Sequence, residues 1–237
     1  MTLTIGSLFS GIGGLELGLE WAGLGPTVWQ VEKDSFRRRW LARHWPAVER
    51  HADIRYVSAA TLAPVDVICG GFPCRGVSSA GAKEGLVHRE SALYREFVRI
   101  IGDIRPRYAI IEQPAVFVRR GLRDVLRRLA ALGYDAEWSC LSACAVGAPH
   151  TRERVFVVAH TDACCQPTRP VHAEASGLRA YAERVRHWRQ PVPDAVRVAH
   201  GVSRWLGAYG DAVVPQVAEV VGRRVIEIEQ TLTRRAA

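Results

Sequence analysis

Short apolar runs alternate with longer segments of helical periodicity along most of the chain. Six runs rich in β-branched and aromatic residues have the length and composition of strands. Strands that alternate with helices in this way are typical of an α/β fold, with a mostly parallel sheet and helices on both faces. The six runs are LTIGSLF at 3–9, TVWQVE at 27–32, VDVICGG at 65–71, RYAIIE at 107–112, AEWSCLSA at 136–143 and ERVFVVAH at 153–160.

Three other segments repeat apolar residues at helical spacing, as helices that pack one face on a sheet do. The first follows Ser91, a suitable N-cap residue. Between residues 161 and 203 the periodicity fades, and proline, histidine, arginine and tryptophan mix without a strand rhythm. The three predicted helix faces are Leu93, Phe97, Ile100, Ile101 and Ile104; Val118, Leu122, Val125, Leu126 and Leu129; and Val217, Val220, Val221, Val225 and Ile228.

A glycine-rich turn follows the first predicted strand. Ser10, Gly11, Gly13 and Gly14 lead directly into a helical segment. Glycines in such a turn let the backbone bend tightly and bring a ligand close to a helix N-terminus. The sequence GIGGLE departs from the G-x-G-x-x-G spacing of dinucleotide-binding proteins, which disfavours a dinucleotide enzyme.

Carboxylates stand at the ends of further strands. Glu32 ends the second run, where an acidic side chain of an open α/β sheet can accept hydrogen bonds from a ribose. A helix-capping role is the alternative. Asp53, in HADIRYV, would close a third strand-end position suitable for holding an adenine amino group, although it could also be a plain loop aspartate. Glu112 ends the run RYAIIE.

Cys74, in VICGGFPCRGVSSAG, could be a buried filler, a metal ligand or a nucleophile. Burial is the usual fate of a free cysteine. Cys74 follows a strand and a proline and opens a glycine- and serine-rich loop, so it lies at the strand edge where open α/β sheets bind ligands. A nucleophilic thiol needs such exposure. Glu112, Arg152 and Arg154 could converge with it on one pocket.

Charge and composition extend this interpretation. Apolar residues make up 48% of the 237 residues and charged residues 24%, as in globular proteins. The net charge of +8 comes almost entirely from arginine and favours a polyanionic partner such as nucleic acid. No apolar run approaches the roughly 20 residues that cross a bilayer, and the N-terminus lacks a leader pattern. We expect an intracellular, soluble protein.

The six cysteines predict neither a disulfide framework nor a metal site. Most of them lie in strand-like segments, and disulfide frameworks are not expected inside a cell. Cys164 and Cys165 lie near His160 and His172, but adjacent cysteines do not have the spacing of zinc ligands. We therefore expect no metal.

Four segments, taken in order, resemble the motifs of the DNA (cytosine-5)-methyltransferase family. The resemblance implies a Rossmann-like, S-adenosylmethionine-dependent methyltransferase fold, S-adenosyl-L-methionine as cofactor and double-stranded DNA as substrate. The target cytosine would be flipped out of the duplex, as enzymes that act on a base require. The segments are SLFSGIGGLELGL at 7–19, GGFPC at 70–74, GAPHTRERVFVVA at 147–159 and GDAVVPQVAEVVG at 210–222.

The resemblance also implies roles for individual residues. Cys74 would add to carbon 6 of cytosine, Glu112 would act at ring nitrogen N3, and Arg154, with Arg152 nearby, would orient the base. The residues expected at the cofactor are Phe9, Ser10, Gly11, Gly13, Glu32, Asp53, Pro73 and Asp211. The residues expected at the DNA are Arg75, Ser78, Lys83, Arg89 and Trp188, although Trp188 could instead anchor its own lobe.

The expected organisation follows from these motifs. Residues 1–160 would form the catalytic and cofactor-binding domain, residues 161–203 a short target-recognition region, and residues 204–237 a segment that returns to the catalytic domain. Such a short recognition region predicts a short or relaxed target sequence. We expect a monomer in the cytoplasm of a bacterium, or encoded by a phage, associated with the nucleoid.

The chain departs from the usual family pattern at several positions. Arg75 stands where relatives have glutamine, Gln113 and Pro114 replace asparagine and valine, and Asp211 replaces asparagine. The four core groups at 74, 112, 152 and 154 nevertheless remain, which favours an active enzyme. The alternatives are a degenerate homologue that binds DNA without methylating it, an enzyme with altered cofactor or base preference, and an enzyme that acts on RNA.

Overall fold

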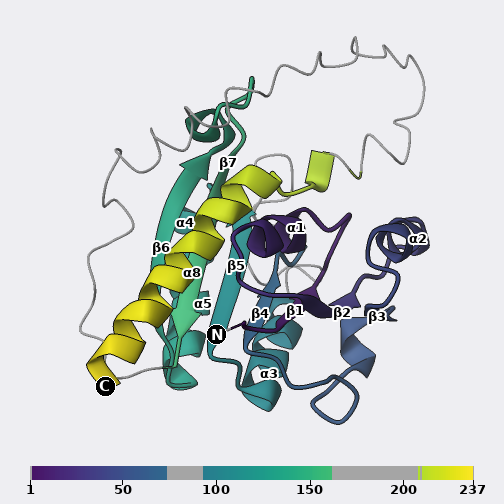
Figure 1. The fold of residues 1–237 in the computed structure, drawn as a ribbon, viewed down its shortest axis with the longest axis horizontal. Helices are drawn as coiled ribbons and strands as arrows, with labels where there is room; N and C mark the ends of the chain where they lie inside the picture. Colours follow the sequence, from purple (N-terminus) through teal and green to yellow (C-terminus); the bar gives the residue numbers. More distant parts are fainter. Residues whose placement is uncertain (1, 74–92, 162–207, 209, 237) are drawn as a thin grey trace.

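A single seven-stranded sheet organises the protein in the computed structural model, which describes residues 2–73, 93–161, 208 and 210–236 (Figure 1). The strand order is β3-β2-β1-β4-β5-β7-β6. Of these strands only β7 runs against the others, because it pairs antiparallel with both β5 and β6. The strands are β1 (Ile5–Leu8), β2 (Thr27–Val31), β3 (Glu49–His51), β4 (Val67–Gly70), β5 (Tyr108–Pro114), β6 (Asp135–Ser142) and β7 (Glu153–His160).

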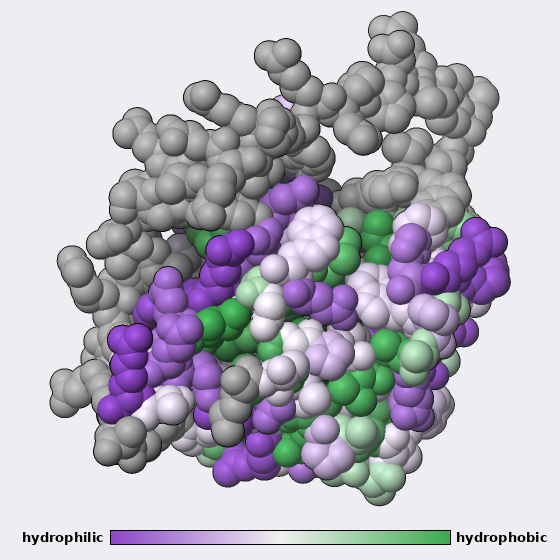
Figure 2. Space-filling model, in the orientation of Figure 1, coloured by the Kyte–Doolittle hydropathy of each residue, from purple (hydrophilic) through white to green (hydrophobic). Residues whose placement is uncertain are grey.

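Helices cover both faces of this sheet, as the sequence predicts. Helices α3, α4 and α5 lie behind the sheet in Figure 1, and α1 and α8 lie in front of it. Helix α2 projects at one side, where Figure 2 shows a gathering of hydrophilic side chains. The helices are α1 (Gly14–Trp21), α2 (Ser35–His44), α3 (Tyr94–Ile104), α4 (Phe117–Arg120), α5 (Leu122–Ala131) and α8 (Pro215–Ala236), with short 3₁₀ turns η1 (Ile54–Tyr56) and η4 (Ala143–Val146).

The central strands are buried on both faces, which explains their continuous apolar sequences. Successive side chains of a strand point to opposite faces. In β5, Tyr108 and Ile110 therefore pack toward α1 and α8, whereas Ala109 and Ile111 pack toward α3 and α5. All four side chains are almost fully buried.

Small residues bring α1 and α8 into close contact. A Cβ atom on Gly18 would collide with the backbone oxygen of Pro215 and lie 2.5 Å from the Cβ of Ala218. A Cβ atom on Gly222 would lie 2.6 Å from that of Ala22. Glycine at these positions therefore lets the C-terminal helix dock directly on the helix that follows the glycine-rich turn.

Replacing Gly18 with alanine is expected to lower the free energy of unfolding by about 2 kcal/mol, because overpacking at a tight helix contact outweighs the better helix propensity of alanine. Gly102 of α3 is a matched control, since a Cβ there would make only ordinary contacts with Leu132 at 3.4 and 3.8 Å. Gly102→Ala should leave stability unchanged or raise it. Urea denaturation of both variants tests the contrast, and equal effects would contradict the packing argument.

The predicted fold class is confirmed, and the six predicted strands appear within a few residues of their expected ends. The third predicted helix appears as α8 and the first as α3. Within the described residues, no helix combines the length and apolarity needed to cross a membrane.

Three local features differ from the sequence prediction. Strand β3 is not among the six predicted runs, because it is a three-residue edge strand of charged character. Helix α2 was also missed, because Leu41 is its only buried residue and leaves no apolar stripe. The second predicted helix is two helices, α4 and α5, separated at Gly121, where a Cβ atom would collide with the ring of Phe117.

Candidate active site

The turn after β1 has the tight backbone that its glycines predict. Gly11 and Gly13 have φ angles of 60° and 89°, in the left-handed region that favours glycine. Phe9 adopts a φ of 57°, which is uncommon for a non-glycine residue. The ring of Phe9 stacks on that of Phe97 at a centroid distance of 6.5 Å. The half-buried backbone of this turn, with the buried Ser10, borders the start of α1.

Glu32 ties the end of β2 to this turn. Its Oε2 accepts a hydrogen bond of 2.8 Å from the backbone N–H of Gly11, and its Oε1 accepts one of 2.8 Å from the N–H of Asp34. Burial raises the pKa of Glu32, and these two hydrogen bonds oppose the rise. Each carboxylate oxygen retains acceptor capacity, so the side chain could accept ribose hydroxyls. Asp34, and not Glu32, caps α2.

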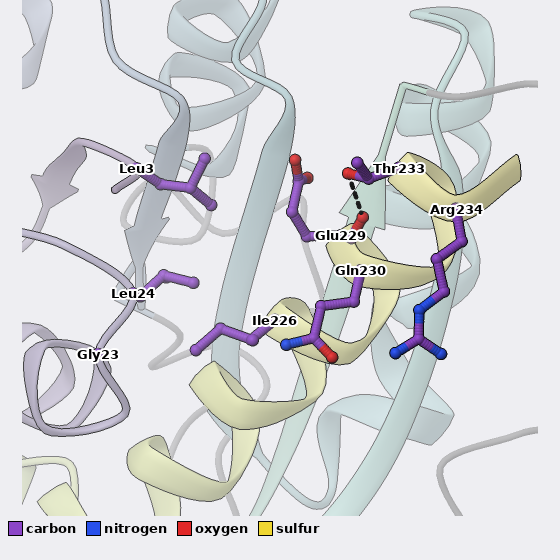
Figure 3. A pocket seen from close by; sticks show the side chains of 8 residues that line it. All are labelled: Leu3, Gly23, Leu24, Ile226, Glu229, Gln230, Thr233 and Arg234. Carbon is purple, nitrogen blue, oxygen red and sulfur yellow. Dashed lines mark hydrogen bonds between the residues drawn. The ribbon is translucent and has the colours of Figure 1, made fainter. Parts of the chain in front are cut away.

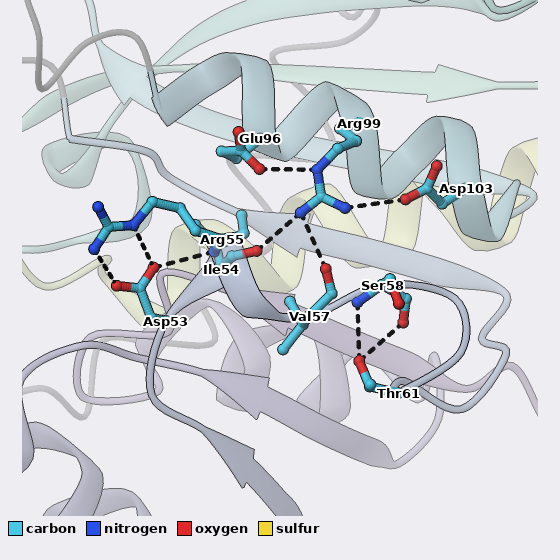
Figure 4. Close-up of polar contacts among 9 residues, drawn as sticks. All are labelled: Asp53, Ile54, Arg55, Val57, Ser58, Thr61, Glu96, Arg99 and Asp103. Atoms are coloured by element: carbon cyan, nitrogen blue, oxygen red, sulfur yellow. Dashed lines mark hydrogen bonds and ion pairs between the residues drawn. The ribbon is translucent and has the colours of Figure 1, made fainter.

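Asp53 lies two residues after β3 and caps the turn η1 (Figure 4). Its carboxylate accepts hydrogen bonds from the backbone N–H and the guanidinium of Arg55, with Nη2 of Arg55 2.5 Å from Oδ2. The hydrogen bond from the Arg55 side chain lowers the pKa of Asp53 to about 2. Asp53 is therefore a charged acceptor near neutral pH, at the same sheet edge as Glu32.

Glu112 and Arg154 form an ion pair on neighbouring strands. Pro114 pairs with Arg154 in the β5–β7 register, which brings Nε of Arg154 to 2.9 Å from Oε1 of Glu112. Glu112 is only 8% exposed. Burial raises the pKa of Glu112, while the charges of Arg154 and Arg152 oppose the rise. A buried carboxyl group with a raised pKa is suited to donating a proton or a hydrogen bond near neutral pH.

The backbone that leads to position 74 is shaped around this carboxyl group. A Cβ on Gly71 would lie 2.7 Å from Oε2 of Glu112, so only glycine fits there without displacing the carboxylate. Gln113 donates a hydrogen bond of 2.9 Å from Nε2 to the backbone oxygen of Phe72. The exposed Pro73 follows. Strand β5 thus fixes the chain up to the residue before Cys74.

A segment near the C-terminus joins the two halves of the site. Arg152 donates a hydrogen bond of 2.5 Å from Nη1 to the backbone oxygen of Gly210. The exposed Asp211 pairs with Arg37 of α2, with Oδ2 2.6 Å from Nη2. The carboxylate of Asp211 also raises the pKa of Glu112. The segment of Gly210 and Asp211 therefore contacts both Arg152, beside β7, and helix α2.

The structure brings together most of the predicted site residues that it describes. Phe9, Ser10, Gly11, Gly13, Glu32 and Asp53 follow β1, β2 and β3, Pro73 follows β4, and Glu112 lies in β5 two residues before its end. Parallel strands end at one edge of a sheet, which is where open α/β folds bind ligands. Arg154 contacts Glu112, Arg152 contacts Gly210, and Asp211 contacts Arg37. The other predicted residues lie outside the described residues: Cys74, Arg75, Ser78, Lys83, Arg89 and Trp188.

Sequence reasoning missed a polar cluster beneath the glycine-rich turn. Glu16 of α1 is fully buried, and burial raises its pKa to about 7. Nε2 of the buried Gln30 lies 3.4 Å from Oε1 of Glu16. Ser10 donates a hydrogen bond of 2.9 Å to the hydroxyl of Ser7 beside them. A glutamine inside the apolar run TVWQVE was the available sequence signal.

The opposite edge of the sheet has a different character. A pocket of about 390 Å³ lies between Leu3, Leu24 and the end of α8 (Figure 3). Nearby, Glu229 pairs with Arg107 at 2.8 Å and accepts a hydrogen bond of 2.7 Å from the Tyr108 hydroxyl. These contacts tie α8 to the start of β5. Among the described residues, no group of three or more histidine, cysteine or acidic side chains could hold a metal ion.

Comparison with known proteins agrees with this geometry. The family model described as C-5 cytosine-specific DNA methylase matches residues 3–175. The type II methyltransferase M.FnuDI of Fusobacterium nucleatum is 30% identical over 164 residues, which is 64% of this chain and 45% of that protein. The type II methyltransferase M2.BsuMI of Bacillus subtilis is 32% identical over 161 residues, which is 65% of this chain and 41% of that protein.

A solved structure extends the likeness in fold. The crystal structure of the S. pombe Dnmt2 methyltransferase matches with a TM-score of 0.60 at 18% identity, over 74% of this chain and 57% of that chain. This chain spans less than half the length of the two curated relatives that it matches. The family match, the ordered motifs and the sheet topology agree, and the chain belongs to the C-5 cytosine-specific DNA methylase family.

Proposed function

We propose that this chain methylates carbon 5 of cytosine in double-stranded DNA, with S-adenosylmethionine as the methyl donor. The family membership supports the reaction class. The observation that carries the proposal is the buried Glu112–Arg154 pair, held at the end of β5 beside the backbone that leads to Cys74. A thiol, a carboxyl group and a guanidinium group are the side chains that this chemistry needs.

The residue types follow from the reactivity of cytosine. Carbon 5 is a poor nucleophile until a nucleophile adds to carbon 6, and the Cys74 thiolate would make that bond. Glu112 would donate a hydrogen bond or a proton to N3, which relieves the negative charge that the addition places on the ring. Arg154 would orient the base from its O2 side. Carbon 5 would then bond to the methyl group as the methyl–sulfur bond breaks and the sulfur leaves as a neutral thioether. A base would remove the carbon 5 proton, and the thiolate would be expelled from carbon 6.

The described residues fit the proposed cofactor. Its sulfonium centre supplies an electrophilic methyl group. Gly11 and Gly13 permit the tight turn after β1, and a Cβ on Gly11 would meet no atom nearer than 4.0 Å, which would leave room for a ligand there. Glu32 would accept the ribose hydroxyls, and Asp53 would accept the adenine amino group. Phe9, Ser10, Pro73 and Asp211 would complete the lining.

The proposed DNA partner agrees with the charge of the chain. The net charge of +8 would attract the phosphate backbone, which supplies much of the affinity of DNA-binding proteins. Arg75, Ser78, Lys83, Arg89 and Trp188 remain the proposed DNA contacts, and residues 161–203 the proposed recognition region. The target must leave the base stack before Cys74 could reach carbon 6.

Methyl transfer is expected to depend on Cys74. We expect tritiated methyl groups to enter DNA of mixed sequence with the wild-type protein, and Cys74→Ala to abolish incorporation, because no other side chain would form the bond to carbon 6. Cys144 is exposed and serves as the control, since Cys144→Ala should retain full activity. A scintillation assay on both variants, with DNA and RNA substrates in parallel, makes the measurement.

A DNA-binding homologue without activity is the second candidate. The departures at Arg75, Gln113, Pro114 and Asp211 favour it, because they lie next to the proposed chemical groups. This candidate predicts salt-dependent binding of duplex DNA and no incorporation by the wild-type protein. Incorporation that persists in Cys74→Ala would contradict the proposed mechanism.

A further inference from the structure

A side chain of helix α3 holds the turn that carries Asp53. Arg99 lies in the middle of α3 and donates two hydrogen bonds of 3.0 Å from Nη2, to the backbone oxygens of Ile54 and Val57 (Figure 4). These two residues belong to the turn that begins at Asp53. Their side chains are buried in the core, so the turn is fixed by both its backbone and its side chains.

The guanidinium of Arg99 is itself held in place by two carboxylates of its own helix. Nε donates a hydrogen bond of 2.8 Å to Glu96, and Nη1 donates one of 3.1 Å to Asp103. Four of its five N–H groups are thus engaged, on three sides of the planar group. Only arginine offers donors in this fixed fork, and a lysine could not reach all four acceptors at once.

We infer that Arg99 is a positioning residue for adenine recognition: it sets the turn that aims Asp53 at the adenine amino group. This inference rests on the proposed function, in which Asp53 binds the cofactor. Arg99 itself touches the turn and not the ligand. Without Arg99, the backbone oxygen of Val57 loses this partner and that of Ile54 keeps only the N–H of Val57 at 3.5 Å, so the turn relaxes toward solvent.

The test measures the choice between two ligands that differ at the edge of the base that carries the adenine amino group, where the inosine compound has a carbonyl oxygen at carbon 6 and a proton on N1. S-adenosylhomocysteine carries that group, and S-inosylhomocysteine has an oxygen in its place. We expect wild-type protein to bind the first about 10-fold more tightly by calorimetry, the effect of one hydrogen bond. Asp53→Ala should remove the preference, and Arg99→Met should lower it to about twofold or less.

Two further variants separate this role from a general loss of structure. Arg95, exposed on the same helix, gives the control Arg95→Met, which should keep the wild-type preference. Arg99→Lys retains the positive charge beside Glu96 and Asp103 and is the more conservative change. It should melt near the wild-type temperature and still lose most of the preference.

The possible outcomes test the positioning role of Arg99 separately from the proposed contact between Asp53 and adenine. If Asp53→Ala abolishes the preference and the folded Arg99→Lys protein keeps it, the positioning role is overturned and the adenine contact stands. If Asp53→Ala keeps the preference, the adenine contact itself is wrong, and the positioning role falls with it. If wild-type protein binds neither ligand, both the cofactor proposal and this inference are overturned.

Discussion

Glu112→Gln is expected to lower the rate of methyl transfer about 100-fold or more, the usual contribution of a general acid, with little change in the affinity for S-adenosylmethionine. Glutamine has the shape of glutamate and can still donate a hydrogen bond to N3. It cannot transfer a proton, so it relieves the negative charge of the ring only in part, through that hydrogen bond. Single-turnover kinetics, with cofactor binding measured separately by calorimetry, isolates this chemical step.

A second buried carboxylate–arginine pair provides the control. Glu137 of β6 pairs with Arg224 of α8 at 2.8 Å and is comparably buried, at 11% side-chain exposure against 10% for Glu112. Glu137→Gln should reduce stability and leave the rate of methyl transfer unchanged. Equal loss of rate in both variants would mean that Glu112 acts only through the integrity of the fold.

Glu16→Gln is expected to stabilise the protein by roughly 3 kcal/mol at pH 8, from a pKa rise from 4.5 to about 7 at 1.36 kcal/mol per pKa unit. Burial is the main cause of the rise, and the nearby hydroxyls of Ser7 and Ser10 oppose it. The folded protein keeps the proton of Glu16 up to about pH 7, whereas the unfolded chain releases it near pH 4.5. Stability therefore falls as the pH rises between these values.

The pH dependence of this effect makes it testable. Below pH 4.5 both states hold the proton, so the variant and the wild type should differ little. Between pH 4.5 and 7 the difference should grow, and above pH 7 it should stay constant. Urea denaturation across this range gives the difference in the free energy of unfolding between the variant and the wild type. The contributions of the ionisable groups that both proteins share cancel in this difference. A difference that does not vary with pH would contradict a protonated Glu16 in the folded state.

The fold was predictable because its signals are local. A strand buried on both faces needs continuous apolar residues, as in RYAIIE, and a helix on the sheet needs a stripe such as Leu93, Phe97 and Ile100. The segments that carried no such signal were missed. Helix α2 buries only Leu41, and the edge strand β3 is a short charged segment. A buried element requires apolar residues at regular spacing, which produces a recognisable sequence pattern. An exposed element does not require such a pattern.

The candidate site likewise has features that the sequence predicts and features that it does not. Strand ends are readable, so the positions of Glu32, Asp53 and Glu112 at one edge follow from the chain order and parallel topology. The sequence did not indicate which distant residues contact one another around this edge. Arg37 is 174 residues from Asp211, and Arg99 is 45 residues from Ile54. Nothing in the local sequence around a partly buried arginine such as these indicates which distant group it will contact.

The sequence by itself determined the family motifs, the α/β class, and the residue types that stand at each strand end, because these depend on local periodicity and on spacing along the chain. Only the tertiary structure decided the ionisation of Glu16 and Glu112 and the anchoring of the Asp53 turn by Arg99. A pKa and a long-range hydrogen bond depend on what surrounds a group in space. Those surroundings exist only once the strands have assembled and water has been excluded.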